Sequence, residues 1–176
     1  MNLSGLANII GNSIVGGVPG GGGGTPSQPT NAWSMYTDGT SQYAESNTSP
    51  YSTLDGDTNF SFSVWLKPDN VTHARVVFHI PRNAVSTESQ VFLWIRNSTG
   101  LLNFSVEIPG FYQRSNVGLT TGVWQHVAIT VDLSQPNYQK TKIYINGVDA
   151  TGLGNQASGI WPGTTLSTAT DKLGVG

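Results

Sequence analysis

The stretch that decides the fold is GVWQHVAITVDLSQPNYQKTKIYING, residues 122–147. Its first part alternates between two sets of side chains. One set is mainly apolar and consists of Val123, Val127, Ile129 and Val131. The other set is polar or aromatic and consists of Trp124, His126, Thr130 and Asp132. A period of two indicates a β-strand that buries one face.

The second part of this stretch completes a hairpin. Residues 133–139 carry turn formers, and the alternation resumes at Ile143 and Ile145. The dipeptide Asn146-Gly147 favours a tight primed turn, because both residues accept positive φ angles. We therefore predict a long hairpin within an antiparallel sheet.

The same stretch resembles the central hairpin of laminin-G-like, concanavalin-A-like jelly-roll domains. In that family a Trp precedes a His by two residues, and an apolar-Tyr-apolar-Asn/Asp-Gly turn follows. FSFSVWLKP at 60–68 resembles the early core strand of the family, and SMYTDGTSQY at 34–43 resembles its opening strand. The resemblance covers roughly residues 32–176 and implies an all-β fold, an antiparallel two-sheet jelly-roll sandwich.

Short alternating segments and turn signals extend this prediction along the chain. We expect strands near 33–37, 41–46, 59–67, 73–80, 89–96, 101–108, 111–115, 122–133, 139–146 and 172–175. One inner face should carry Phe60, Phe62, Val64 and Leu66. The other should carry Val91, Leu93, Ile95, Phe104, Val106 and Ile108. In the family a further closing strand follows the segment that 171–176 resembles. Here we expect either that the sandwich is completed in another way or that the chain is a portion of a longer protein, and an incomplete sheet would leave an open edge.

The N-terminal part differs in composition from the rest. Residues 1–18 have apolar side chains at roughly helical spacing, and residues 19–31 form a Gly/Pro-rich linker. Such a short helix is not stable alone in water, so this segment should dock onto a partner. The docking residues we expect are Leu3, Leu6, Ile9, Ile10 and Ile14.

Bulk composition excludes several classes of function. The formal net charge is -2 and only 10% of residues are charged, which gives no electrostatic basis for binding nucleic acid. The chain has no cysteine, so disulfides and cysteine metal sites are excluded. Residues 1–19 contain no Lys or Arg and no long apolar run, so we expect neither a secretory signal nor a membrane span.

Catalytic motifs are missing from the sequence. Glucanases of this fold resemble one another in a strand with the pattern Glu-x-Asp-x-x-Glu, which this chain lacks. Glu45, Glu88 and Glu107 lie singly on or near separate predicted strands. The histidines show no metal-ligand spacing, and we interpret His126 as a structural residue packed against Trp124. We therefore expect no enzyme activity, with a glucanase-like hydrolase as the least favoured alternative.

Two kinds of binding site remain open. Asp55, Asp57 and Asn59 alternate in a loop and could supply oxygens to Ca²⁺, although ordinary Asx turns are the favoured explanation. No other cofactor is expected. Carbohydrate binding needs aromatic platforms beside hydrogen-bonding groups, and a loop tryptophan can also serve as a lid on the core. The candidates for the carbohydrate site are Trp161, Tyr112, Arg114 and Trp94.

The layout suggests a virion structural, decoration or appendage protein. Residues 1–18 would dock onto a capsid, a tail or another copy of the chain, and the jelly roll would be displayed toward host or environmental glycans. Such a particle is assembled in the host cytoplasm and needs no signal peptide. The alternative is a carbohydrate-binding or adhesion module of a secreted bacterial protein, located at the cell surface or outside the cell.

Overall fold

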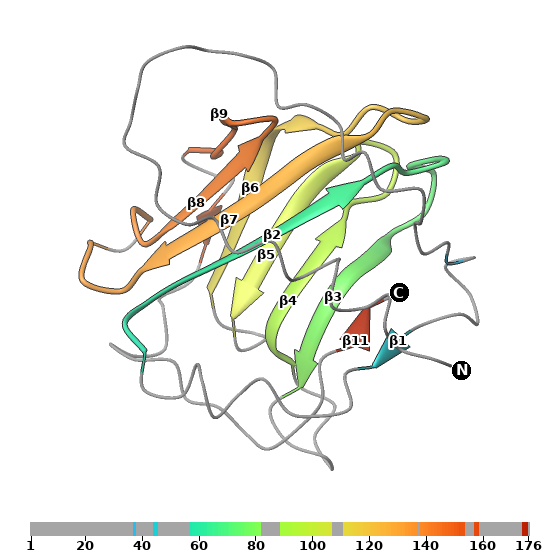
Figure 1. Cartoon of the computed structure of the whole chain (residues 1–176). Coiled ribbons are helices and arrows are strands. Elements are labelled where there is room, and N and C mark those ends of the chain that lie inside the picture. Colours follow the sequence, from blue (N-terminus) through green and yellow to red (C-terminus); the bar gives the residue numbers. More distant parts are fainter. Residues whose placement is uncertain are drawn as a thin grey trace.

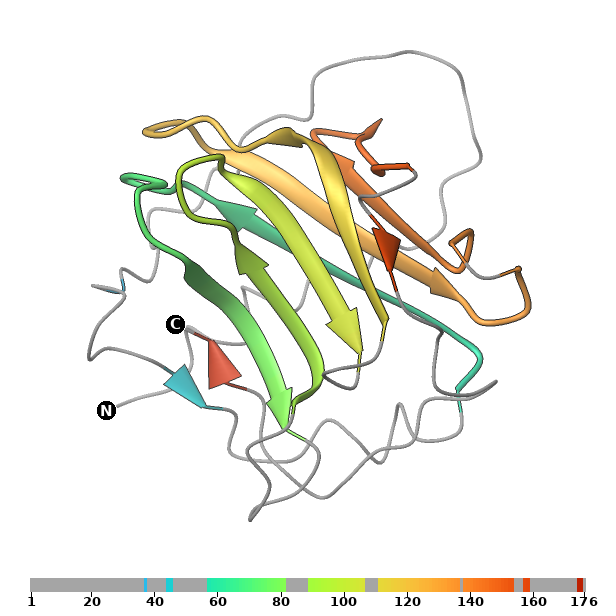
Figure 2. The same ribbon diagram turned by 180° about the vertical axis from the view of Figure 1, so that it is seen from behind.

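The computed structural model describes residues 37, 44–45, 57–81, 89–106, 111–136, 138–153, 157–158 and 174–175. Within these ranges every regular element is a strand, and no helix is present that could cross a bilayer. The strands form two antiparallel sheets, so the predicted all-β sandwich is confirmed. Figures 1 and 2 show the two sheets as stacked layers.

One sheet has seven strands in the order β1-β11-β3-β4-β5-β6-β10. Their bounds are β1 Ala44–Glu45, β3 Arg75–Pro81, β4 Ser89–Ile95, β5 Leu101–Val106, β6 Phe111–Gly118, β10 Ala157–Ser158 and β11 Gly174–Val175. The other sheet has four strands in the order β2-β7-β8-β9. Their bounds are β2 Asn59–Leu66, β7 Gln125–Asp132, β8 Thr141–Ile145 and β9 Val148–Asp149.

The predicted central hairpin is confirmed as the β7–β8 pair, with Val127 opposite Ile145. After β8, Asn146 and Gly147 have φ angles of 53° and 80°, so a primed turn leads directly into β9. Our sequence analysis did not predict β9. Figure 1 shows this hairpin in orange beside β2.

The placement of Val123 on the buried face was wrong. Its side chain is 45% exposed, because β7 begins only at Gln125 and Val123 lies in the preceding turn. Gln125 occupies the first buried position of the strand, and its Oε1 accepts a hydrogen bond from the Thr120 N–H at 2.6 Å.

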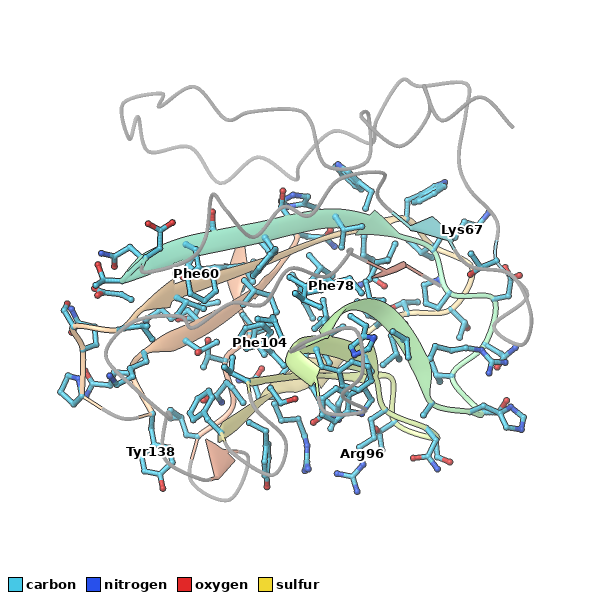
Figure 3. The ribbon with its side chains drawn as sticks, turned by 90° about the horizontal axis from the view of Figure 1, so that it is seen from below. Phe60, Lys67, Phe78, Arg96, Phe104 and Tyr138 are labelled. Atoms are coloured by element: carbon cyan, nitrogen blue, oxygen red, sulfur yellow. The ribbon has the colours of Figure 1, made fainter. Side chains whose placement is uncertain are left out.

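The core lies between the two sheets. Figure 3 shows Phe60 on β2 and Phe78 and Phe104 on the seven-stranded sheet, all in the space between the layers. Phe104 is completely buried, and a side chain of this size contributes about 1.5–3 kcal/mol by burial. The described residues that we predicted on the inner faces all belong to this core or pack against it: Phe60, Phe62, Val64, Leu66, Val91, Leu93, Ile95, Phe104 and Val106. Ile108 lies outside the described residues.

A bulge interrupts the pairing of β5 and β6 between Leu101 and Asn103. Leu101 pairs with Gly118, whereas Asn103 pairs with Arg114, so residues 115–117 lie opposite Leu102 alone. The buried Ser115 hydroxyl replaces the missing ladder bond: its Oγ accepts from the Leu102 N–H at 2.9 Å and donates to the Val117 carbonyl at 2.7 Å. From the pair Asn103–Arg114 to the pair Val106–Phe111 the register is continuous, so the outward-facing neighbours of β5 and β6 lie in the regular part of the ladder.

Other sequence expectations have mixed outcomes. Short strands occur at β1 and β11, within the predicted ranges 41–46 and 172–175. β10 was missed, because its stretch was interpreted as a loop. Thr37 is not in a strand, and the rest of the predicted strand at 33–37 lies outside the described residues, as do the docking segment and the linker.

Candidate functional site

The outer side of the seven-stranded sheet carries a shallow pocket of about 350 Å³ over β4, β5 and β6. Figure 2 shows this sheet from the side opposite the β7–β8 hairpin, and Figure 3 shows Arg96 on the outer side of the sheet, away from the core phenylalanines. The described residues that line the pocket are Trp94, Arg96, Asn97, Asn103, Tyr112 and Arg114.

Strand register brings these residues together. Trp94 on β4 pairs with Asn103 on β5, and Asn103 pairs with Arg114 on β6. Because paired residues point to the same side of a sheet, the three side chains form one row across two strand spacings, about 10 Å. The adjacent row contains Phe92 and Tyr112, both paired with Ser105. The pocket therefore lies on the side of the sheet that faces away from the core.

Arg114 is held in place by two neighbours. Its Nε donates a hydrogen bond of 3.0 Å to Oδ1 of Asn103, whose side chain is buried. Its guanidinium carbon lies 5.7 Å from the centroid of the Tyr112 ring, within the range of a cation–π contact. Among the described residues, the Arg114 side chain donates a hydrogen bond through Nε, so its two Nη groups remain available to a ligand.

An aromatic row extends from the pocket along β4 to β3. The ring centroids of Trp94 and Phe92 are 4.7 Å apart, and those of Phe92 and His79 are 5.7 Å apart in an edge-to-face arrangement. Burial lowers the pKa of His79 below its ordinary value, because desolvation disfavours the charged imidazolium. Its Nε2 is buried and has no hydrogen-bond partner in the described part of the chain. The neutral ring thus continues the apolar part of the row.

Three of the predicted carbohydrate-site residues come together in this pocket: Trp94 from β4, and Tyr112 and Arg114 from β6. The fourth, Trp161, lies outside the described residues. Arg96 was not among the residues predicted for the carbohydrate site. Asn97 and Asn103 were missed. Asn103 could have been found from the alternation of β5, since it lies between the inward-facing Leu102 and Phe104.

The predicted calcium residues do not form a recognisable site in the described part of the chain. Asp55 lies outside it, and the Nδ2 of Asn59 donates to Thr58 Oγ1 at 3.1 Å, a local turn contact. The described residues contain no cluster of three or more acidic or histidine side chains that could hold a metal ion. Calcium binding through Asp57 and its neighbours stays a prediction from the sequence.

His126 has a different neighbour from the one we expected. It lies opposite Trp65 in the β2–β7 pair, and the two ring centroids are 5.3 Å apart. Trp124 precedes β7, whereas Trp65 is in register on the neighbouring strand, so cross-strand pairing decided the contact. Burial lowers the pKa of His126 as well. This pair lies on the outer side of the four-stranded sheet, away from the pocket.

Comparisons with known proteins bear on the fold. The chain is similar to a native heptameric SAP-like pentraxin from Limulus polyphemus, with 17% identity, a TM-score of 0.47 and coverage of 70% of this chain and 54% of that one. It is also similar to a proposed carbohydrate-binding protein from Bacteroides ovatus, with 19% identity, a TM-score of 0.44 and coverage of 76% of this chain and 36% of that one.

The chain therefore spans only about half and about a third of these two proteins. No curated protein matches the chain. Residues 38–171 match a laminin G family model described as the concanavalin A-like lectin/glucanases superfamily, and the chain therefore belongs to this superfamily.

Proposed function

We propose that this domain is a non-catalytic carbohydrate-binding module that holds a saccharide on the outer side of β4, β5 and β6. The observation that carries the proposal is the pocket itself. It combines two aromatic rings, two guanidinium groups and two amide side chains on one side of a sheet whose other side forms the core.

The chemistry of these groups suits a saccharide. A sugar ring has apolar C–H faces, which pack on aromatic rings such as Trp94 and Tyr112, and a rim of hydroxyls, which need hydrogen-bond donors and acceptors. Asn97 and Asn103 contribute amides to the lining, and Arg114 contributes donors. A volume of about 350 Å³ is at the small end for ligand pockets, so it favours contact with a short part of a longer chain.

A binding role is proposed in preference to hydrolysis. Retaining glycosidases need two carboxyl groups roughly 5–5.5 Å apart beside the scissile bond. The described residues that line the pocket include no carboxylate. The side chain of Glu45 is outside the part of the chain that the structure describes. The same holds for the whole of Glu88 and Glu107.

The setting of the module is a separate matter. A particle protein would use residues 1–18 for docking, and these lie outside the described residues. A carbohydrate-binding module fits both a virion surface and a secreted adhesion protein, the two settings predicted from the sequence. The virion setting stays a prediction, and its test is whether residues 1–18 are needed for incorporation into a particle.

A panel of soluble polysaccharides tests the binding role by isothermal titration calorimetry. We expect at least one polysaccharide to bind, and we expect Trp94→Ala and Tyr112→Ala each to weaken it by about 2 kcal/mol, roughly thirtyfold in Kd. The matched control is Trp65→Ala, which removes a half-buried tryptophan from the outer side of the other sheet.

The control variant should bind as the wild type does. If no polysaccharide binds, the proposed function is wrong. If Trp65→Ala weakens binding as much as Trp94→Ala does, the proposed location is wrong. Thermal unfolding of each variant shows whether a loss of binding reflects a loss of folded protein.

A further inference from the structure

We propose that the saccharide recognised by this pocket is acidic, and that Arg96 and Arg114 bind its carboxylate or sulfate groups. This inference rests on the proposed function and names the class of ligand. Its starting point is the distribution of charge. The chain has only eight Lys and Arg residues, and two of its arginines line this one pocket.

Nothing in the described lining neutralises these two cations. The chain has ten acidic residues, yet none of the described ones lines the pocket. Two like charges that share a pocket repel each other, and an anionic ligand relieves this repulsion because it is attracted to both. The neutral polar side chains of the pocket do not compete for the guanidinium groups as a carboxylate would.

The outer side of the four-stranded sheet provides a comparison within the same molecule. There Nζ of the exposed Lys142 on β8 lies 3.2 Å from Oδ2 of Asp149 on β9. The positive charge is therefore paired with a carboxylate on the neighbouring strand. Hydrogen bonding to the Thr151 side chain is the largest cause that lowers the pKa of Asp149, and the Thr151 N–H and then Lys142 lower it further. The pocket cations have no such carboxylate partner among the described residues.

Arg114 is oriented before a ligand arrives. The hydrogen bond from Nε to Asn103 and the contact with the Tyr112 ring restrict the plane of the guanidinium. A fixed, planar fork of N–H donors matches two oxygens of a carboxylate or sulfate and forms paired, charge-assisted hydrogen bonds with them. The aromatic rings alongside can pack on the sugar ring that carries this group. Saccharide and anion are therefore recognised together.

Two matched pairs of polymers test this inference, with the full-length chain at low ionic strength: dextran sulfate against dextran, and polygalacturonate against its methyl ester. We expect at least one acidic polymer to bind tenfold or more tightly than its neutral partner, and added salt to weaken the binding. Binding of both acidic polymers indicates recognition of the shared anionic chemistry. If only one acidic polymer binds, its anionic group, sulfate or carboxylate, is the group that the pocket recognises.

Variants connect the preference to the two arginines. Arg96→Gln and Arg114→Gln should each reduce affinity for the acidic polymer at least tenfold and change affinity for a neutral saccharide less than twofold. Arg114→Lys keeps the positive charge but loses the planar fork of N–H donors, so its affinity for the acidic polymer should lie between those of the wild type and Arg114→Gln. The control is Lys67→Gln, which removes one exposed positive charge beyond the end of β2, on the other sheet (Figure 3), and should change affinity less than twofold.

Each outcome is decisive. If neutral and acidic polymers bind equally and Trp94→Ala abolishes both, the acidic preference is wrong and the carbohydrate-binding role stands. If poly-glutamate binds as tightly as polygalacturonate, the attraction is to polyanions in general, which also overturns the inference. If none of the saccharides binds, the inference and the proposed function fail together. Arg96→Gln keeps the test valid should the Arg114 variants fail to fold.

Discussion

The two sides of the seven-stranded sheet use the same strands for different purposes. On the inner side, Val91, Leu93 and Phe104 are at most 1% exposed and belong to the hydrophobic core. On the outer side, Trp94 and Arg114 are partly exposed and form a pocket. The inner side needs apolar volume, which many side chains provide, whereas the outer side needs particular groups in a particular arrangement. Successive side chains of a strand point to opposite sides of the sheet, so alternate residues serve the fold and the recognition of a ligand.

The largest expected effect comes from a matched pair of alanine variants on these two sides. Phe104→Ala should lower the free energy of unfolding by about 3–5 kcal/mol, because it leaves a cavity in the core. Trp94→Ala should lower it by no more than about 1 kcal/mol, because the indole is only partly buried. Urea denaturation measures both. Equal destabilisation by the two variants would contradict the separation of roles.

The next effect concerns the bulge between β5 and β6. Ser115→Ala removes the acceptor of the Leu102 N–H and leaves a buried donor without its partner. We expect a loss of about 1–3 kcal/mol in the free energy of unfolding. Ser61→Ala, an exposed serine on β2, is the control and should cost less than about 0.5 kcal/mol. A neutral Ser115→Ala would show that the bulge does not depend on this hydroxyl.

A smaller effect sharpens the account of the outer side. Asn103→Asp keeps an oxygen acceptor for Arg114 but places a negative charge beside the guanidinium. The affinity for an acidic saccharide should fall by about 1 kcal/mol, roughly fivefold, because the pocket loses net positive charge. Calorimetry with the preferred acidic polymer measures this change. Tighter binding by the Asp variant would contradict the role assigned to Arg114.

The smallest effect is the dependence of stability on pH. Burial lowers the pKa of His79 and of His126 below 6.5, so the unfolded chain takes up protons before the folded chain does. Stability should therefore fall as the pH drops through about 6.5, and this contribution ends below the folded pKa values. His79→Phe should make the dependence of stability on pH weaker and leave only the contribution of His126. Denaturation midpoints between about pH 5 and pH 8 test the sign, and midpoints that increase as the pH falls would contradict it.

The sequence predicted the features that depend on local pattern. Alternation identified β7 and β8, and it assigned Leu93 inward and Trp94 outward on β4. Positive φ angles at Asn146-Gly147 follow from residue type, so the primed turn was also predictable. Each of these features is decided by residues close together in the chain.

The remaining features depend on partners that are distant in sequence. The two-residue strands β9 and β10 exist because an adjacent strand offers hydrogen bonds, and they carry little propensity of their own. The contact between Arg114 and Asn103 depends on the register of β5 against β6. A register between two strands cannot be deduced from the alternation of either strand alone. This is why the two arginines and Asn103 were not joined into one site from sequence.

The most direct test of the location is the nuclear magnetic resonance signal of the tryptophan indoles during titration with the acidic polymer that binds best, used as short fragments. The Trp94 indole and the backbone amides of 94–97 and 112–114 should shift with saturation, while the Trp65 indole on the other sheet should not. Substitution of each tryptophan assigns the signals. Shifts at Trp65 and His126 with Trp94 unchanged would contradict binding on the outer side of β4–β6.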